Sequence, residues 1–171
     1  MRYGTRTVLG RGWTTVGVRP IGTMHIGYDY HYLYVALSPV SGDVFALIMP
    51  GMDSNCYEVF LKEFSRHVEQ RGLVTEETPY VRFIADNAGS HHATEVTIPA
   101  GILVENLPPY SPELNPCERF FEELRRVLKS RVCVSVKEVE SIILTALKHY
   151  WDNPDAVVKL TYWEWMKNAT S

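Results

Sequence analysis

The stretches YVRFIAD (residues 80–86) and ILVENLPPYSPELNPCERFF (residues 102–121) decide the fold. Each opens with a short apolar run, which predicts a buried strand, and the first strand ends at Asp86. The second run passes through a proline-rich loop, which is stiff and extended, into an amphipathic helix. Strands that alternate with helices are typical of an α/β domain, in which ligands bind beyond the carboxyl ends of the strands.

The flanking sequence supplies the other elements of such a domain. A long hairpin is predicted over residues 23–49, with one buried face formed by the alternating tyrosines Tyr28 to Tyr34. Amphipathic helices are predicted over residues 54–71, 116–130 and 136–150, and a last one begins at Asn153-Pro154. We therefore expect one domain over residues 1–171, with a mixed sheet, flanking helices and a helical C-terminal end.

Composition excludes several classes of protein. The 171 residues are 46% hydrophobic and 22% charged, which excludes a disordered chain. The net charge of −3 excludes a strongly basic DNA-binding arm, but it does not exclude a nucleic-acid enzyme, because a carboxylate-rich metal site offsets a basic patch.

Cysteine use and hydropathy indicate a cytoplasmic protein. The three cysteines are odd in number and widely spaced, which argues against disulfides and zinc knuckles. No apolar run approaches the ~20 residues that a membrane span needs, so we expect no membrane contact.

Asp86 and Glu118 are the candidate catalytic residues, and each has a structural alternative. Asp86 with Asn87 can form a simple turn, because both side chains bond their own backbone. Glu118 follows Asn115 at the spacing of a capping box, which predicts a carboxylate that closes the helix start. If both carboxylates instead meet across the crevice, they offer the hard oxygen ligands that Mg²⁺ or Mn²⁺ prefers. Two such ions, about 4 Å apart, support phosphodiester hydrolysis.

The stretches FIADNAGSHHA and ILVENLPPYSPELNPCERFFEELRRVLKSRV resemble the catalytic core of transposases of the IS630/Tc1/mariner group, in the DDE superfamily. The resemblance implies a ribonuclease-H-like fold and metal-dependent DNA cleavage followed by strand transfer. Asp86 matches the family's second catalytic Asp, and Glu118 matches its catalytic Glu. Both would bind two Mg²⁺ or Mn²⁺ ions.

The beginning of the chain departs from the family pattern. MRYGT at residues 1–5 matches the sequence just after the family's first catalytic Asp. We therefore expect that Asp and its central strand to lie upstream of residue 1, so that this strand is truncated or missing, together with the family's helix-turn-helix DNA-binding region. Asp29 is the least implausible internal substitute. Losing part of a central strand would leave unpaired sheet edges.

Other residues near the two acids are candidates for supporting roles. Asn87 can orient a water or an Asp86 oxygen, and the family resemblance places His91 near the site. Arg125, Arg126 and Lys129 form a basic stretch that can contact DNA phosphates, although a solvated helix face is the structural alternative. The resemblance implies transposon ends and target DNA as partners, a bacterial, nucleoid-associated location, and a homodimer or an assembly with full-length transposase or an upstream-encoded fragment.

Two other functions remain open on the sequence. A catalytically inactive fragment that binds DNA or transposase would bind DNA without Mg²⁺-dependent nicking, and the missing first Asp favours it for the isolated chain. A ribonuclease-H-like nuclease unconnected with transposition would cleave RNA–DNA hybrids instead. Whether the isolated chain is an active enzyme is therefore left open.

Overall fold

Two small sheets organise the fold of the computed structural model, which describes residues 1–10, 13–19, 21–86, 96–164 and 166. The first sheet is antiparallel with the order β1-β2-β3, and the second is a parallel pair, β4-β5. Within the described residues no strand joins the two sheets, so the predicted mixed sheet is divided into two parts. The strands are β1 (Arg2–Gly4), β2 (Tyr30–Leu37), β3 (Val44–Met49), β4 (Val81–Ala85) and β5 (Ile102–Asn106).

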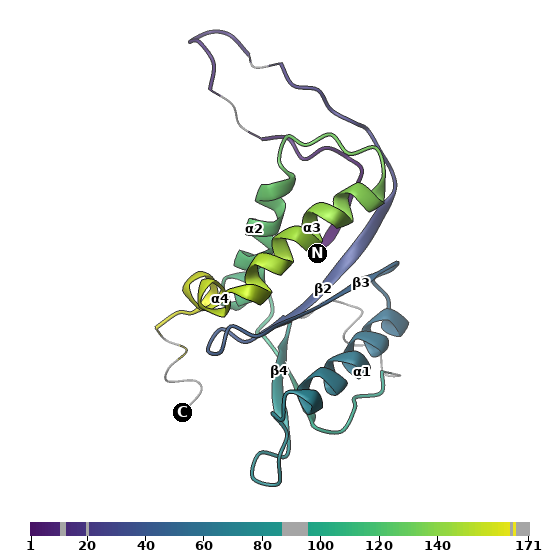
Figure 1. Ribbon diagram of the computed structural model, residues 1–171, viewed down its shortest axis with the longest axis vertical. Coiled ribbons are helices and arrows are strands. Elements are labelled where there is room, and N and C mark those ends of the chain that lie inside the picture. Colours follow the sequence, from purple (N-terminus) through teal and green to yellow (C-terminus); the bar gives the residue numbers. More distant parts are fainter. Residues whose placement is uncertain (11–12, 20, 87–95, 165, 167–171) are drawn as a thin grey trace.

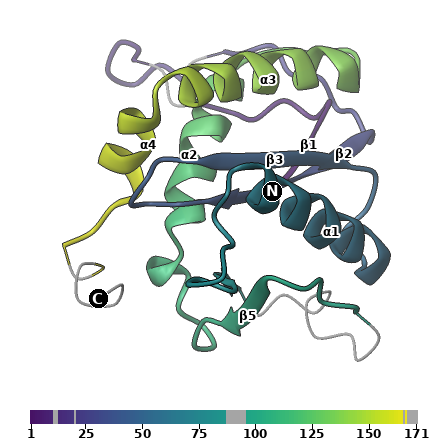
Figure 2. The same ribbon diagram turned by 60° about the horizontal axis from the view of Figure 1, so that its bottom comes forward.

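Helices cover both faces of the antiparallel sheet (Figure 2). One helix, α1, lies on one side, and the C-terminal helices lie on the other (Figures 1 and 2). The bounds of α1, α2 and α3 agree with the sequence prediction to within about two residues, because capping residues mark their starts. The last helix, predicted to run toward Trp165, ends at Thr161, and η2 was not predicted. The helices are α1 (Ser54–Gln70), the short 3-10 turn η2 (Pro112–Leu114), α2 (Pro116–Leu128), α3 (Val136–Asp152) and α4 (Pro154–Thr161).

Two apolar clusters hold these layers together. The larger one packs α2, α3 and α4 against the sheet and contains the fully buried Leu33, Phe120 and Leu124. The smaller one packs α1 against the other face of the sheet and centres on Phe60 and Leu61. Each cluster removes apolar side chains from water on one face of β2, so the strand is covered on both sides.

The first half of the predicted hairpin differs from expectation. Regular strand begins only at Tyr30, and Tyr28 and Tyr30 are exposed, so the tyrosine alternation does not mark one buried face. Residues before β2 instead pair with the chain that leaves β1, through the bonds Thr5 N–H to Asp29 O and Thr7 N–H to His25 O, both 3.0 Å. Gly27 permits this close approach, because a Cβ there would lie 1.8 Å from the Thr5 hydroxyl oxygen.

The described helices include none that is both long and apolar enough to cross a membrane.

Leu147→Ala is expected to destabilise the protein by about 2–5 kcal/mol, because Leu147 is 1% exposed in the larger cluster and its loss leaves a cavity. Leu144→Ala lies on the same helix at 45% exposure and is the matched control, since both substitutions change helix propensity equally. Urea unfolding followed by circular dichroism measures both variants. Equal losses of unfolding free energy in the two variants would contradict the assigned packing of α3.

Candidate functional site

Asp86 lies directly after β4, on an exposed position at the carboxyl end of the strand. Hydrogen bonding of β4 to the neighbouring chain continues to its last residue, because the Leu107 N–H donates to the Ala85 carbonyl at 2.8 Å. The carboxylate therefore projects from a fixed support, as the sequence predicted. Asn87 and His91, the two candidates that follow it, lie outside the described residues.

Glu118 lies in the first turn of α2, and the helix start is capped without it. The Asn115 side chain accepts from the Cys117 N–H at 3.0 Å, and the Asn115 N–H donates to the Pro112 carbonyl at 3.0 Å. The Glu118 carboxylate instead faces Arg125, one of its oxygens lying 3.8 Å from a guanidinium nitrogen. The capping box that the sequence allows is therefore not formed, and the carboxylate remains available for other contacts.

Asp86 and Glu118 act on the same two groups. Burial raises the pKa of the Cys117 thiol to about 12, and the negative charges of Glu118 and Asp86 add to the rise. Burial also lowers the pKa of the Met1 ammonium to about 6, an effect that Arg125 reinforces and that Glu118 and Asp86 oppose. The end of β4 and the start of α2 therefore bring two carboxylates into the same neighbourhood.

Tyr57 also interacts with Asp86, a relation that could not be predicted from the sequence. It lies on α1 among the residues whose helical spacing predicts a core face. Burial raises the pKa of its phenol to about 12, and the charge of Asp86 contributes. Helical periodicity identifies Tyr57 as a packing residue, and only the fold shows that this helix face reaches the end of β4.

The donor set fits a hard divalent cation in part. Two carboxylates from separate elements supply the oxygen ligands that such cations prefer. Within residues that the structure describes, however, no group of three His, Cys, Asp or Glu side chains is placed to hold a metal ion. Asp29, the internal substitute considered from the sequence, lies beside the start of β2, where its carbonyl accepts from Thr5.

The basic stretch after Glu118 is partly neutralised by its own helix. Arg126 pairs with Glu123 at 2.7 Å, and Arg125 faces Glu118. Lys129 is exposed at the C-terminal cap of α2. Such exposed pairs within a helix stabilise the fold by only about 0.3–0.5 kcal/mol, so they leave the arginines able to exchange partners.

Comparisons with known proteins agree with this arrangement. A family model described as DDE superfamily endonuclease matches residues 1–140. An uncharacterised protein of Sinorhizobium fredii, y4pE/y4sA, is 27% identical over 135 residues, which cover 78% of this chain and 95% of that protein.

Solved structures with a similar fold include a pre-cleavage Mos1 transpososome, with a TM-score of 0.69 and 18% identity over 96% of this chain and 55% of that one. A Mos1 transposase paired-end complex with the left transposon end has a TM-score of 0.65 and 18% identity, over 93% and 50% of the two chains. This chain thus spans about half the length of those transposases. The predicted ribonuclease-H-like α/β fold and the resemblance read from the sequence are confirmed, and the chain belongs to the DDE superfamily endonuclease family.

Proposed function

We propose that this chain is the catalytic part of a transposase that cleaves DNA phosphodiesters and transfers the cut strand, with Asp86 and Glu118 as ligands of two Mg²⁺ or Mn²⁺ ions. The observation that carries the proposal is the position of Asp86 at the carboxyl end of β4 and of Glu118 in the first turn of α2. The charges of both carboxylates also contribute to the pKa shifts of Cys117 and Met1. The family match supports the reaction class. Among similar folds are Mos1 paired-end complexes described with Mn and with Mg, which supports the choice of cation.

The chain's own groups restrict the chemistry. When bound, divalent ions supply charge stabilisation and activation of the attacking oxygen. Cys117 is a poor nucleophile, because a thiol with a pKa of about 12 keeps its proton at neutral pH. The proposed attacking group is water or a DNA 3′-hydroxyl, in keeping with the reaction class that the family match supports. Arg125, Arg126 and Lys129 contact phosphates of the DNA, and Asn87 and His91 support the site.

The first residue of the chain lies close to the same acids. Met1 precedes β1, its ammonium donates to the Leu33 carbonyl at 2.6 Å, and the charges of Glu118 and Asp86 act on that ammonium. The inactive binding module considered from the sequence is the alternative to a catalytic role for this chain.

Asp86→Asn and Glu118→Gln are each expected to weaken Mn²⁺ binding by roughly tenfold or more. Even substitutions of residues that only support a metal ligand lower metal affinity by about that factor. Electron paramagnetic resonance of free Mn²⁺ measures the affinity. Glu122→Gln, an exposed position one turn further along α2, is the matched control and should bind Mn²⁺ within about twofold of the unaltered chain.

The reaction itself is tested on the same variants. Mg²⁺-dependent nicking of duplex DNA, lost in Asp86→Asn and Glu118→Gln but retained in Glu122→Gln, is expected. Preferential cleavage of RNA–DNA hybrids would assign a ribonuclease-H-like nuclease instead. DNA binding without nicking would show that the chain is the catalytically inactive binding module.

The placement of Asp86 beside Tyr57 is tested by alkaline titration. Asp86→Asn is expected to lower the pKa of Tyr57 below about 12, because one of the charges that disfavour the phenolate is removed. The pKa should stay above the ordinary value of about 10, since burial is the larger cause. Absorbance of phenolate in the ultraviolet gives the titration, and the difference from Tyr57→Phe isolates this residue.

Glu118→Gln is the matched control, because Glu118 is not a cause of the Tyr57 shift. The folded pKa lies above the unfolded one, so the Tyr57 contribution to stability is complete below pH ~10 and is lost as the pH rises towards 12. An unchanged pKa of Tyr57 in Asp86→Asn would show that Asp86, at the end of β4, does not lie close to Tyr57 on α1. It would contradict the assigned position of Asp86 in the site.

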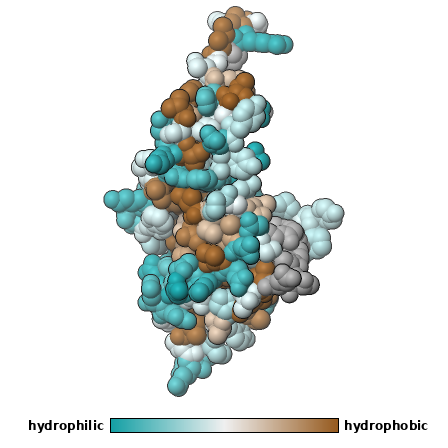
Figure 3. Space-filling view, turned by 90° about the vertical axis from the view of Figure 1, so that its right-hand side faces the viewer, coloured by the Kyte–Doolittle hydropathy of each residue, from teal (hydrophilic) through white to brown (hydrophobic). Residues whose placement is uncertain are grey.

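Homodimer formation is supported by the connection between β1 and β2, which projects from the body in Figure 1. Its described residues include Trp13, Val16 and Ile21, whose side chains are fully exposed. Figure 3 shows hydrophobic residues on this projecting end as well as on the body. Exposed apolar side chains gathered in one segment are typical of interaction sites, and the proposed partner is a second copy of the chain.

Replacing Trp13, Val16 and Ile21 together with Ser is expected to convert the dimer into a monomer, as measured by sedimentation velocity. Val40→Ser is the control. Val40 is an exposed apolar residue in the turn between β2 and β3, so its replacement should leave the dimer intact. A triple variant that sediments like the unaltered chain would exclude this connection from the interface.

A further inference from the structure

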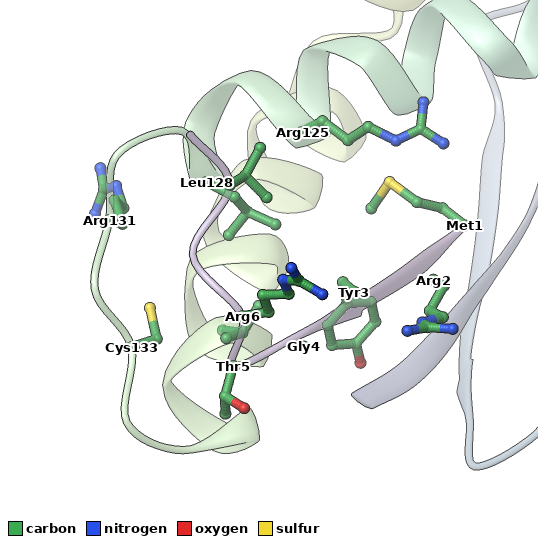
Figure 4. A pocket seen from close by; sticks show the side chains of 12 residues that line it. Met1, Arg2, Tyr3, Gly4, Thr5, Arg6, Arg125, Leu128, Arg131 and Cys133 are labelled. Atoms are coloured by element: carbon green, nitrogen blue, oxygen red, sulfur yellow. The ribbon is translucent and has the colours of Figure 1, made fainter. Parts of the chain in front are cut away.

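A cavity of about 140 Å³ lies between β1 with its continuation and the end of α2 with the turn that follows (Figure 4). It offers roughly ten times the space that one buried water needs. Four arginines line it, Arg2, Arg6, Arg125 and Arg131, and no acidic side chain is among the described residues of its wall. The cavity is therefore a concentration of positive charge that the net charge of the chain conceals.

Two of the four arginines have partners. The Arg2 guanidinium lies 4.3 Å from the centre of the Tyr30 ring, and Arg125 faces Glu118. In the described part of the chain, Arg6 and Arg131 form no ion pair. Figure 4 shows the Arg6 guanidinium between Leu128 and Tyr3, while Arg125 extends past Met1. Arg6 and Arg131 are exposed residues that line the cavity, and guanidinium groups form charge-assisted hydrogen bonds with anions that enter from solvent.

The two walls are fixed relative to each other. The Ser130 N–H donates to the Val8 carbonyl at 2.8 Å, and Val8 forms a parallel bridge with Lys129. The Arg131 N–H donates to the Leu128 carbonyl at 3.3 Å. The chain that carries Arg6 is thereby tied to the turn that carries Arg131. The end of α2 attracts cations by its dipole, which accounts for basic residues on the helix but not for Arg6, which follows β1.

We propose that this cavity binds a phosphate group, with Arg6 and Arg131 as its principal ligands. Guanidinium groups match phosphate oxygens through paired hydrogen bonds, and the space admits a tetrahedral oxyanion. The phosphate comes from a DNA strand or from a free phosphate compound, and both share this chemistry.

The position of the cavity relates it to the acidic pair. Arg125 and Met1 line the cavity, and both also interact with Glu118. A strand whose phosphate occupies the cavity therefore runs beside Asp86 and Glu118. For a DNA source, the inference rests on the proposed function and adds a fixed anchor for the strand next to the site of cleavage.

The test compares Arg6→Gln/Arg131→Gln with Lys62→Gln/Arg66→Gln. The control pair removes the same charge from exposed positions on α1, outside the cavity. Calorimetry with pyrophosphate measures the free-phosphate arm, and fluorescence anisotropy with a short duplex at several salt concentrations measures the DNA arm. Thermal melting of each variant checks that the fold is retained, and Arg6→Lys, which keeps the charge but loses the planar fork, should bind with intermediate affinity.

Loss of roughly tenfold in duplex affinity, with the salt slope reduced by about 1, is expected in the cavity variant, since the one phosphate contact that is lost contributes about 0.9 to that slope. Loss of pyrophosphate binding alone would assign a free phosphate compound, and loss of duplex binding alone would assign the DNA strand. Equal behaviour of the cavity and control variants towards both ligands would overturn the proposal. Both arms are measured without divalent cations, so a failure of the metal site is distinguished from a failure of this cavity.

Discussion

The burial of α2 against the antiparallel sheet is the constraint on which the rest of the structure depends. Phe120 and Leu124 are completely buried in the cluster that also contains Leu33 of β2. Because these side chains must face the sheet, the helix has one permitted rotation about its axis. That rotation sets the direction of Glu118, which lies just before the apolar face, and of Arg125, which lies just after it. A carboxylate and an arginine thus reach the edge of the sheet as a result of apolar packing.

The second acid is positioned by an independent device. Parallel pairing between β4 and β5 continues to Ala85, and Asp86 is the first residue released from it. The smaller cluster beneath α1 includes Phe83 of β4 against Phe60 and Phe64, with ring centres 6.2 and 5.3 Å apart. The separation of the two sheets means that side-chain packing, rather than backbone pairing, relates β4 to the rest of the molecule in the described residues.

Much of this architecture could be predicted from the sequence, because the signals were local. Asn115 with Pro116 marks the start of α2, and Asp53 caps α1 by accepting from the Cys56 N–H at 2.8 Å. The start of β2 was predicted wrongly, since the tyrosine alternation continues into a segment that pairs with the chain after β1. β-propensity describes a residue's fit to a pleated surface and cannot tell a strand from an extended connection.

The candidate site was only partly readable for a related reason. Asp86 and Glu118 could be singled out by their positions at element ends. Whether Glu118 caps its helix could not be predicted, because this depended on the Pro112 carbonyl, which accepts from the Asn115 N–H. The cavity arginines gave no signal, because Arg6 and Arg131 are brought together by contacts between Val8 and the residues after α2. Distant pairings of this kind leave no periodicity in the chain.

The protonated state of Cys117 has a consequence for which cations the site prefers. A thiolate is a soft ligand that would favour zinc or copper over magnesium, and the position next to Glu118 would put such a ligand among the acids. Burial and the neighbouring negative charges make thiolate formation costly, so the sulfur competes weakly as a donor. In the proposed metal site, therefore, the two carboxylates present charged oxygen donors, while the neighbouring sulfur keeps its proton in the metal-free protein.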